Sequence, residues 1–226
     1  MDHGVGFFIA TIKGFYSPAV LFSGGLDSSV IAFLAEEPKL YTLCASEQSY
    51  DYLNAERSSA LLGLDFEPVL FNEGDIKEAA SALGSKSSLD IAHYILARAV
   101  KEDTVLSGQG ADELFLGYAK YSKMNDEEKN TKARDDFEKW MFEGKEKKIF
   151  ALFKKEIIFP YLALKDTAFS LPLEEREGKK FLRSLTVSLG LPEEIALQRK
   201  KAMQYGSGVD KAVKRLIASS SQPLQS

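Results

Sequence analysis

The chain of 226 residues has little cysteine, little histidine and no excess of basic residues. Its one cysteine, Cys44, excludes an internal disulfide and a cysteine-based zinc knot. Its two histidines, His3 and His93, are too far apart in sequence to suggest a local metal motif. The formal net charge of −4 provides no basic field that would gather nucleic acid. We therefore expect a protein of a reducing compartment that has no nucleic-acid partner.

Long hydrophobic runs are also missing. The longest apolar stretches are far shorter than a bilayer span, and the run at residues 5–12 has neither a basic start nor a small-residue cleavage site. These features predict a cytoplasmic protein without a membrane partner. The composition, 45% hydrophobic and 27% charged, is ordinary for a globular fold.

Strand and helix patterns alternate in the first half of the chain. Strand patterns occupy residues 19–22, 39–45, 65–71 and 103–108, and helical patterns occupy residues 27–37, 53–64, 74–83 and 87–102. This alternation predicts a parallel sheet that is covered by helices on both faces and joined by right-handed crossovers. Residues 1–18 fit either a helix or an edge strand.

The pattern changes after residue 118. Residues 119–156 are dense in Lys, Glu and Asp, with apolar residues at helical spacing, which is typical of solvated amphipathic helices. The Ser- and Gln-rich end is typical of disorder. We therefore predict an α/β core at residues 1–118, a mainly helical part at residues 119–218 that completes the site, and a disordered tail at residues 219–226.

The first strand pattern runs into the sequence SGGLDSS and then into a helix. Free N–H groups at a helix start, with the helix dipole, form an anion site suited to phosphate. Gly24 and Gly25 would let the backbone approach a ligand closely, and Ser23 and Ser28 could donate hydrogen bonds. Asp27 would repel phosphate unless a divalent cation such as Mg²⁺ lies between them. An ordinary helix cap is the alternative interpretation.

The fourth strand pattern ends in the same way, in a glycine turn followed by carboxylates. Ser107 and Gly108 leave this strand, and Asp112 and Glu113 begin a new helix. Ligands bind beyond the carboxyl ends of strands in a doubly wound sheet, so Asp27 and Asp112 could share one Mg²⁺. The alternative is that Asp112 and Glu113 are helix N-terminal carboxylates favoured only by the helix dipole.

These two segments resemble a known family. SGGLDSS is similar to the SGGxDS signature of the PP-loop ATP pyrophosphatases, and it fits neither the Walker A nor the GxGxxG pattern. Together with LSGQGADELF it resembles the synthetase domain of asparagine synthetases and β-lactam synthetases. A third block, PEEIALQRKKAMQYGSG, is similar to the family segment LPxxIxxRxKxxFxxG. The resemblance covers roughly residues 18–215, with the three blocks in the family's order.

The resemblance implies an α/β fold with a doubly wound parallel sheet of about five strands and a C-terminal helical extension. It implies ATP and Mg²⁺ as cofactors. The implied ATP-binding residues are Leu21, Ser23, Gly24, Gly25, Asp27, Ser28, Cys44 through its backbone, Ser107 and Gly108, and the implied metal ligands are Asp27 and Asp112. The implied catalytic residues are Lys200, with Lys201 as the alternative, for charge on an acyl-adenylate, Lys180 on the phosphates, and Gln109 on the amine side.

The chain departs from the family pattern at several positions. Leu116 stands where the family usually has glycine, and Gln109 stands where asparagine synthetases commonly carry a glutamate that could manage the ammonia proton. An amide cannot act as a base. Ile158 and Ala163 replace an arginine and an aspartate of the family block ExRxPFLD. Asp2 stands where the family's glutaminase domain would begin with cysteine, so we expect a stand-alone form without that domain.

The resemblance implies a ligase that forms AMP and pyrophosphate, adenylates a carboxylate such as aspartate, and passes it to ammonia. Its partners would be the carboxylate and ammonia, with a separate glutaminase as one source of the nitrogen, and a homo-oligomer stays open. Two alternatives remain. The chain could bind Mg-ATP with catalysis impaired, as the departures suggest, or it could be another PP-loop adenylating enzyme such as a tRNA thiolase, which the single cysteine and the acidic charge oppose.

Overall fold

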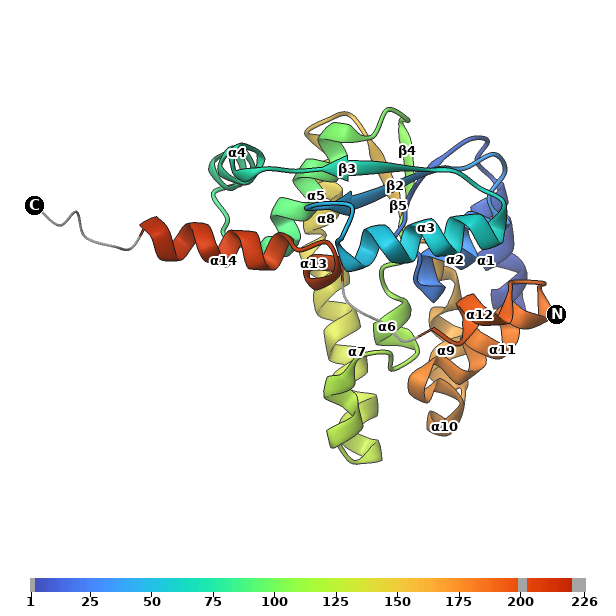
Figure 1. The fold of residues 1–226 in the computed structure, drawn as a ribbon. Coiled ribbons are helices and arrows are strands. Elements are labelled where there is room, and N and C mark those ends of the chain that lie inside the picture. The colour runs from blue at the N-terminus through green and yellow to red at the C-terminus, as the bar shows by residue number, and fades with distance from the viewer. Residues whose placement is uncertain (1–2, 199–202, 221–226) are drawn as a thin grey trace, which may run out of the picture.

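A computed structural model describes residues 3–198 and 203–220, and these form a sheet with helices on both faces (Figure 1). The strands are β1 (Ala19–Leu21), β2 (Lys39–Cys44), β3 (Phe66–Leu70), β4 (Thr104–Leu106) and β5 (Glu156–Ile158). They pair in parallel throughout, in the order β3-β2-β1-β4-β5. The predicted α/β fold, with a doubly wound parallel sheet of about five strands, is confirmed.

Helices connect and cover the strands, with short 3₁₀ segments labelled η. The helices before β4 are α1 (His3–Lys13), α2 (Leu26–Leu34), α3 (Tyr50–Leu62), α4 (Glu73–Leu83) and α5 (Ser88–Ala99). Those after β4 are α6 (Ala111–Leu114), η1 (Ala119–Lys123), α7 (Asp126–Glu143), α8 (Lys145–Ala151), η2 (Pro160–Leu164), α9 (Lys165–Ser170), α10 (Leu173–Arg176), η3 (Glu177–Lys179), α11 (Lys180–Ser188), α12 (Glu193–Ala196), α13 (Met203–Gly206) and α14 (Val209–Ser220). The segment left open between helix and edge strand is therefore helical at α1.

Each central strand contributes to two hydrophobic cores, because successive strand residues point to opposite faces of a sheet. Val20 and Leu40 pack in the core that contains α1 and α2. Leu21 and Tyr41, the next residues along the two strands, pack in the core that contains α4, α5 and α8. Burial on both faces explains why the strand patterns are almost continuously apolar.

The order of the strands places two loops side by side. The chain runs from β1 through β2 to β3 in one direction and then adds β4 on the other side of β1. Val20 of β1 pairs with Leu40 on one side and with Leu106 on the other. The loops that leave β1 and β4 therefore lie side by side at the switch point of the sheet, where ligands bind in folds of this kind.

The strand β5 was not among the strand patterns in the sequence, and it lies in the part predicted to be mainly helical. It has only three residues, too few to show an alternation. It pairs with β4 through Val105 and Ile157, and the N–H of Ser107 donates to the carbonyl of Ile158 at 3.0 Å. This strand fixes the start of the second loop.

The end of the chain differs from the predicted tail in its first two residues. Helix α14 continues to Ser220, so residues 219 and 220 are helical. The rest of the predicted disordered tail, residues 221–226, lies outside the described residues.

Candidate functional site

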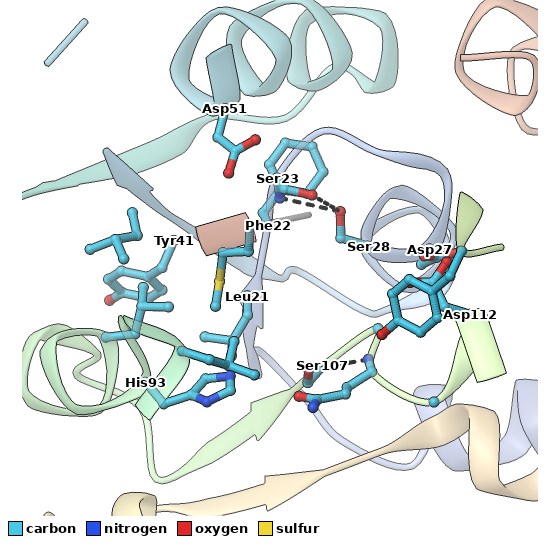
Figure 2. A pocket seen from close by; sticks show the side chains of 18 residues that line it. Leu21, Phe22, Ser23, Asp27, Ser28, Tyr41, Asp51, His93, Ser107 and Asp112 are labelled. Carbon is cyan, nitrogen blue, oxygen red and sulfur yellow. Dashed lines mark hydrogen bonds between the residues drawn. The ribbon is translucent and has the colours of Figure 1, made fainter. Parts of the chain in front are cut away.

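A cavity of about 190 Å³ opens at the carboxyl ends of β1 and β4. Its wall changes from apolar to polar along its length. Figure 2 shows Leu21, Tyr41 and His93 on one side, Ser23, Ser28 and Ser107 in the middle, and Asp27 and Asp112 on the other side, with a further carboxylate, that of Asp51, at the top of the view. The cavity therefore suits a ligand with an apolar ring at one end and charged groups at the other.

The loop after β1 ends at Gly25, which caps the N-terminus of α2 without a side chain. The N–H of Ser23 donates to Oγ of Ser28 at 3.2 Å, and that hydroxyl donates to the carbonyl of Gly25 at 3.2 Å. Because Asp27 and Ser28 in the first turn of α2 line the cavity, the positive end of the helix dipole faces it. This arrangement favours an anion at the polar end of the cavity.

The two glycines of this loop differ in how strictly the structure requires glycine at their positions. Gly24 has a φ of +69°, and a Cβ there would lie 2.3 Å from the carbonyl oxygen of Asn54. Gly25 has a φ of −77°, and a Cβ there would lie 3.5 Å from the hydroxyl of Ser23. Gly24 is thus required by its backbone conformation and by close packing on α3, whereas the sequence analysis attributed both glycines to the approach of a ligand.

Side chains from distant segments hold the loop in place, and the sequence analysis named none of them. Asn54 Nδ2 donates to the carbonyl of Ser23 at 2.8 Å, and the hydroxyl of Ser58 donates to the carbonyl of Gly24 at 2.7 Å. The phenol of Tyr161 donates to the backbone carbonyl of Asp27 at 3.1 Å. The loop is therefore fastened to α3, and the first turn of α2 is fastened to η2, through backbone carbonyls, and none of these three bonds uses an N–H group of the loop.

The loop after β4 packs directly on the first loop. A Cβ at Gly108 would lie 3.0 Å from Cβ of Asp27, so this glycine allows the two loops to touch. Gly110 has a φ of +93° and lies against the ring of Trp140, and α6 begins immediately after it. Asp112 therefore lies in the first turn of α6 and lines the same cavity as Asp27.

Asp27 and Asp112 meet at one ammonium group, which belongs to Lys179. Its Nζ lies 2.6 Å and 2.5 Å from the two carboxylate oxygens of Asp27 and 2.7 Å from Oδ1 of Asp112. The Lys179 side chain is 4% exposed, and the two aspartate side chains are 14% and 8% exposed. Two carboxylates from different loops are thus close enough to contact one cation.

The backbone around Lys179 is shaped to bring it there. Lys179 has a φ of +64°, which is rare for a residue with a side chain, and its N–H donates to the carbonyl of Phe115 at 3.1 Å. A Cβ at Gly117 would lie 2.3 Å from Cε of Lys179, so only glycine fits beside the lysine. Burial lowers the pKa of Lys179, and the negative charge of Asp27 opposes that effect.

The other lysines proposed from the sequence are placed differently. Lys180 is exposed at the start of α11 and lines no part of the cavity. The structure instead places its neighbour Lys179 between the carboxylates. Lys200 and Lys201 lie outside the described residues.

The remaining predicted residues divide between the cavity and the core. Leu21, Ser107 and Gly108 line the cavity. Cys44, the last residue of β2, has a fully buried side chain that does not line it, and burial raises the pKa of its thiol to about 11. Any ligand contact at Cys44 would therefore come from the backbone, as the resemblance implied, and the thiol is part of the packing.

Gln109 lines the cavity and contacts a residue that the sequence analysis passed over. Its Nε2 donates to Oε1 of Glu146 at 2.8 Å. Glu146 lies in the first turn of α8, within the charge-dense segment predicted to be solvated, yet it is only 5% exposed. No pattern in that segment distinguishes this glutamate from its solvated neighbours.

The other departures from the family pattern lie away from the cavity. Ile158 and Ala163 line a separate groove between α1 and β5. Leu116 has a φ of +48°, a left-handed backbone conformation that glycine adopts without strain. The glycine usual at that position thus suits the local backbone. A leucine there carries backbone strain of about 1–2 kcal/mol.

The two aspartates match the ligand chemistry of magnesium. Mg²⁺ prefers oxygen ligands and is usually held by one or two carboxylates together with phosphates. Asp27 and Asp112 provide two carboxylates at one point. The part of the chain that the structure describes contains no cluster of three or more His, Cys, Asp or Glu residues that could hold a metal alone. The donor set therefore fits magnesium that is accompanied by a phosphate ligand.

No helix within residues 3–198 and 203–220 has both the length and the apolar character needed to cross a bilayer.

Comparison with known proteins agrees with the resemblance. A family model described as asparagine synthase matches residues 15–156. A protein of Methanocaldococcus jannaschii, provisionally named a glutamine-hydrolyzing asparagine synthetase, is 28% identical over 89% of this chain and 48% of its own length. Glutamine-hydrolyzing asparagine synthetase of Rattus norvegicus is 30% identical over 82% of this chain and 39% of its own length. The chain thus spans about half or less of the curated relatives that it matches.

A solved structure, titled as a predicted subunit of a tRNA methyltransferase from Methanocaldococcus jannaschii, is also similar. It is 17% identical, covers 83% of this chain and 94% of its own length, and gives a TM-score of 0.39. A similarity with so low an identity and TM-score does not indicate a function for this chain.

Proposed function

Because the chain belongs to the asparagine synthase family, we propose that it is an ATP-dependent amide ligase that forms AMP and pyrophosphate. In this proposal aspartate is its carboxylate substrate and ammonia is its nitrogen donor. The observation that carries the proposal is the convergence of two loops on one cation, with Asp27, Asp112 and Lys179 in direct contact. Such a group of charges at the end of an elongated cavity is suited to a nucleoside triphosphate.

In this proposal the adenosine lies toward Leu21, Tyr41 and Leu43, and the phosphates lie on the loop after β1. The N–H groups at the start of α2 and the hydroxyls of Ser23 and Ser28 bind the phosphates. Asp27 and Asp112 would hold Mg²⁺, which when bound neutralises phosphate charge. The apolar end of the cavity excludes water from the base.

The first half-reaction joins the carboxylate to AMP. A carboxylate oxygen attacks the α-phosphorus, the bond from that phosphorus to the bridging oxygen breaks, and pyrophosphate leaves with the electron pair. The ammonium group of Lys179 stabilises the negative charge on the phosphates from a buried position, where a fixed charge acts more strongly than it does in water. The loop after β1, held to α3 by Asn54 and Ser58, would keep the reacting groups aligned.

The second half-reaction transfers the acyl group to nitrogen. The amine nitrogen attacks the acyl carbon, the acyl–oxygen bond breaks, AMP leaves with the electron pair, and a proton passes from nitrogen to water. Gln109 lies beside this step, and its amide can orient the amine but cannot accept the proton. Lys200 would stabilise charge on the acyl-adenylate.

Exchange of labelled pyrophosphate into ATP tests the proposal, because it reports adenylation without needing the amine. We expect exchange that depends on Mg²⁺ and on a carboxylate, with aspartate as the first choice. The Asp112→Asn variant should lose most of this exchange. Failure to exchange with any proteinogenic amino acid or dicarboxylate would refute the proposal.

A second candidate is a protein that binds Mg-ATP without completing the ligation. It is favoured by Gln109, which replaces the carboxylate common in asparagine synthetases. Calorimetry separates the two candidates. Binding of Mg-ATP with neither exchange nor AMP release would support this candidate, whereas AMP release on addition of ammonium would eliminate it.

A further inference from the structure

Arg176 of α10 is a buried arginine without a carboxylate partner. It is 1% exposed, and its guanidinium lies 4.8 Å from the ring centroid of Phe169. Within residues 3–198 and 203–220, no aspartate or glutamate forms an ion pair with it. Burial of an unpaired charge is costly, and a methionine would fill a similar volume without that cost. What an arginine provides here beyond packing is its directional hydrogen bonds.

The first of these bonds holds the end of the short helix α6. A helix leaves its last carbonyls without helical partners, and α6 ends at Leu114 after only four residues. Nε of Arg176 donates to the carbonyl of Leu114 at 2.8 Å, and the N–H of Lys179 donates to the carbonyl of Phe115 at 3.1 Å. The end of α6 and the segment from Arg176 to Lys179 are thus joined at two adjacent carbonyls.

Helix α7 holds the same segment through two adjacent residues. Nη1 of Arg176 donates to Oδ1 of Asn130 at 2.6 Å, and Nζ of Lys129 pairs with the carboxylate of Glu177. Lys179 has a φ of +64°, a conformation that a residue with a side chain keeps only where its surroundings fix it. The contacts with α6 and α7 therefore account for the backbone that turns the Lys179 side chain toward the two aspartates that it contacts.

We propose that Arg176 is a positioning residue that sets the ammonium group of Lys179 between Asp27 and Asp112. Its guanidinium joins α6, which carries Asp112, to the segment that carries Lys179, so it fixes how these two charges lie relative to each other. Arg176 does not line the cavity, so it acts only through Lys179. The inference rests on the proposed ligase function, in which Lys179 stabilises the negative charge on the phosphates.

The test uses the variants Arg176→Met and Asn130→Ala, with Thr131→Ala as the control. Methionine packs well against an aromatic ring and lacks the directional bonds of the guanidinium. Asn130 is exposed on α7, so its replacement by alanine removes one partner of Arg176 and leaves a folded protein. Thr131, the next residue, is also exposed and is not a partner of Arg176, so it is a matched control.

The first measurement needs no ligase activity. Urea denaturation gives the factor by which Lys179→Met raises the equilibrium constant of unfolding, in the wild-type, Arg176→Met and Asn130→Ala backgrounds. A displaced ammonium group has weaker contacts to lose, so this factor should be about fivefold smaller in both variant backgrounds than in the wild type. The Asn130→Ala background decides the result if the Arg176→Met protein does not fold. An equal factor in all backgrounds, or an equal decrease in the Thr131→Ala background, would overturn the inference.

The second measurement is pyrophosphate exchange per mole of folded protein. Arg176→Met should lower kcat about tenfold and leave KM for aspartate within about twofold, because a displaced ammonium group stabilises the transition state less and does not contact the carboxylate substrate. An unchanged kcat in folded Arg176→Met protein, with the wild type active, would overturn the inference while the ligase function stands. If the wild-type protein shows no exchange, the ligase function fails, and the urea measurement alone decides whether Arg176 positions Lys179.

Discussion

Replacement of Lys179 by methionine should destabilise the protein strongly. The ammonium group is the shared cation of Asp27 and Asp112, with contacts of 2.5–2.7 Å, and all three side chains are largely buried. Removal of one partner from a buried ion pair costs about 3–5 kcal/mol, because the other charge is left without compensation. Here one substitution leaves two carboxylates that also repel each other, so we expect a loss at the upper end of that range.

Methionine is the appropriate replacement because its unbranched side chain is only one atom shorter than that of lysine and carries no charge. The left-handed backbone at Lys179 is equally strained in both proteins, so the strain cancels in the comparison. The matched control is Lys180→Met, whose exposed side chain should change the free energy of unfolding by less than about 0.5 kcal/mol.

Urea denaturation at neutral pH, followed by circular dichroism, measures both effects. The slope of the transition should be equal in the three proteins, so that midpoints convert directly to free energies. Millimolar Mg²⁺ should restore part of the stability of the Lys179→Met protein, since a divalent cation can take over the two carboxylates. A loss below about 1 kcal/mol, or an equal loss in the Lys180→Met control, would show that the three charges do not form the compensated group described here.

Three further predictions concern the loop, the metal ligands and the thiol. Gly24→Ala should destabilise the protein by more than 1 kcal/mol, because φ is positive and the carbonyl of Asn54 blocks a Cβ, whereas Gly25→Ala should cost much less; thermal melts of the two variants compare them directly. Asp112→Asn should raise the Mg²⁺ concentration needed for half-maximal pyrophosphate exchange at least tenfold, and an unchanged requirement would remove this residue from the proposed metal site. Because the folded-state pKa of the Cys44 thiol is raised from 9.0 to about 11, its contribution to stability is complete below pH 9 and is lost as pH rises toward 11. The Cys44→Ala protein should show a shallower loss of stability over that interval, and an identical pH profile would contradict the shift.

The fold was largely predictable from the sequence because its signals are local. The strands that bury both faces show as apolar runs, and the glycines after β1 and β4 mark the two loops. Strand β5 was missed because three residues carry no period, and its pairing with β4 is a long-range property. Residues 1–18 were ambiguous in pattern, and the helix α1 packs against η2, α2 and α9, which are long-range contacts that the sequence does not show.

The site residues that directly follow strand ends could be predicted from the sequence. Those contributed by segments distant in the sequence could not. Asp27 and Asp112 follow directly from strand ends, and the cavity brings them together. The choice between Lys179 and Lys180 depends on two left-handed residues, Gly178 and Lys179, that set where α11 begins. The sequence analysis identified no helix boundary at that point, so the break was missed.

Glu146 was missed for a different reason. The charge pattern of α7 and α8 is that of solvated helices, and burial of one glutamate among many depends on how α8 packs against α5. Asn54, Ser58 and Tyr161 are similar cases, because each acts on the backbone of a loop far away in the sequence. Side-chain bonds to a distant backbone leave no periodic signal.

The way α1 and η2 pack has a consequence for how the chain could be divided. The matched family region, residues 15–156, ends at the first residue of β5, yet α1 precedes it and η2 follows it, and these two segments contact each other. A fragment cut at those limits would expose one side of β4 and would lose Tyr161, which holds the carbonyl of Asp27. The stretch that similarity recognises is therefore smaller than the unit that can fold, and excision at its borders should yield an aggregating polypeptide rather than a minimal nucleotide-binding module.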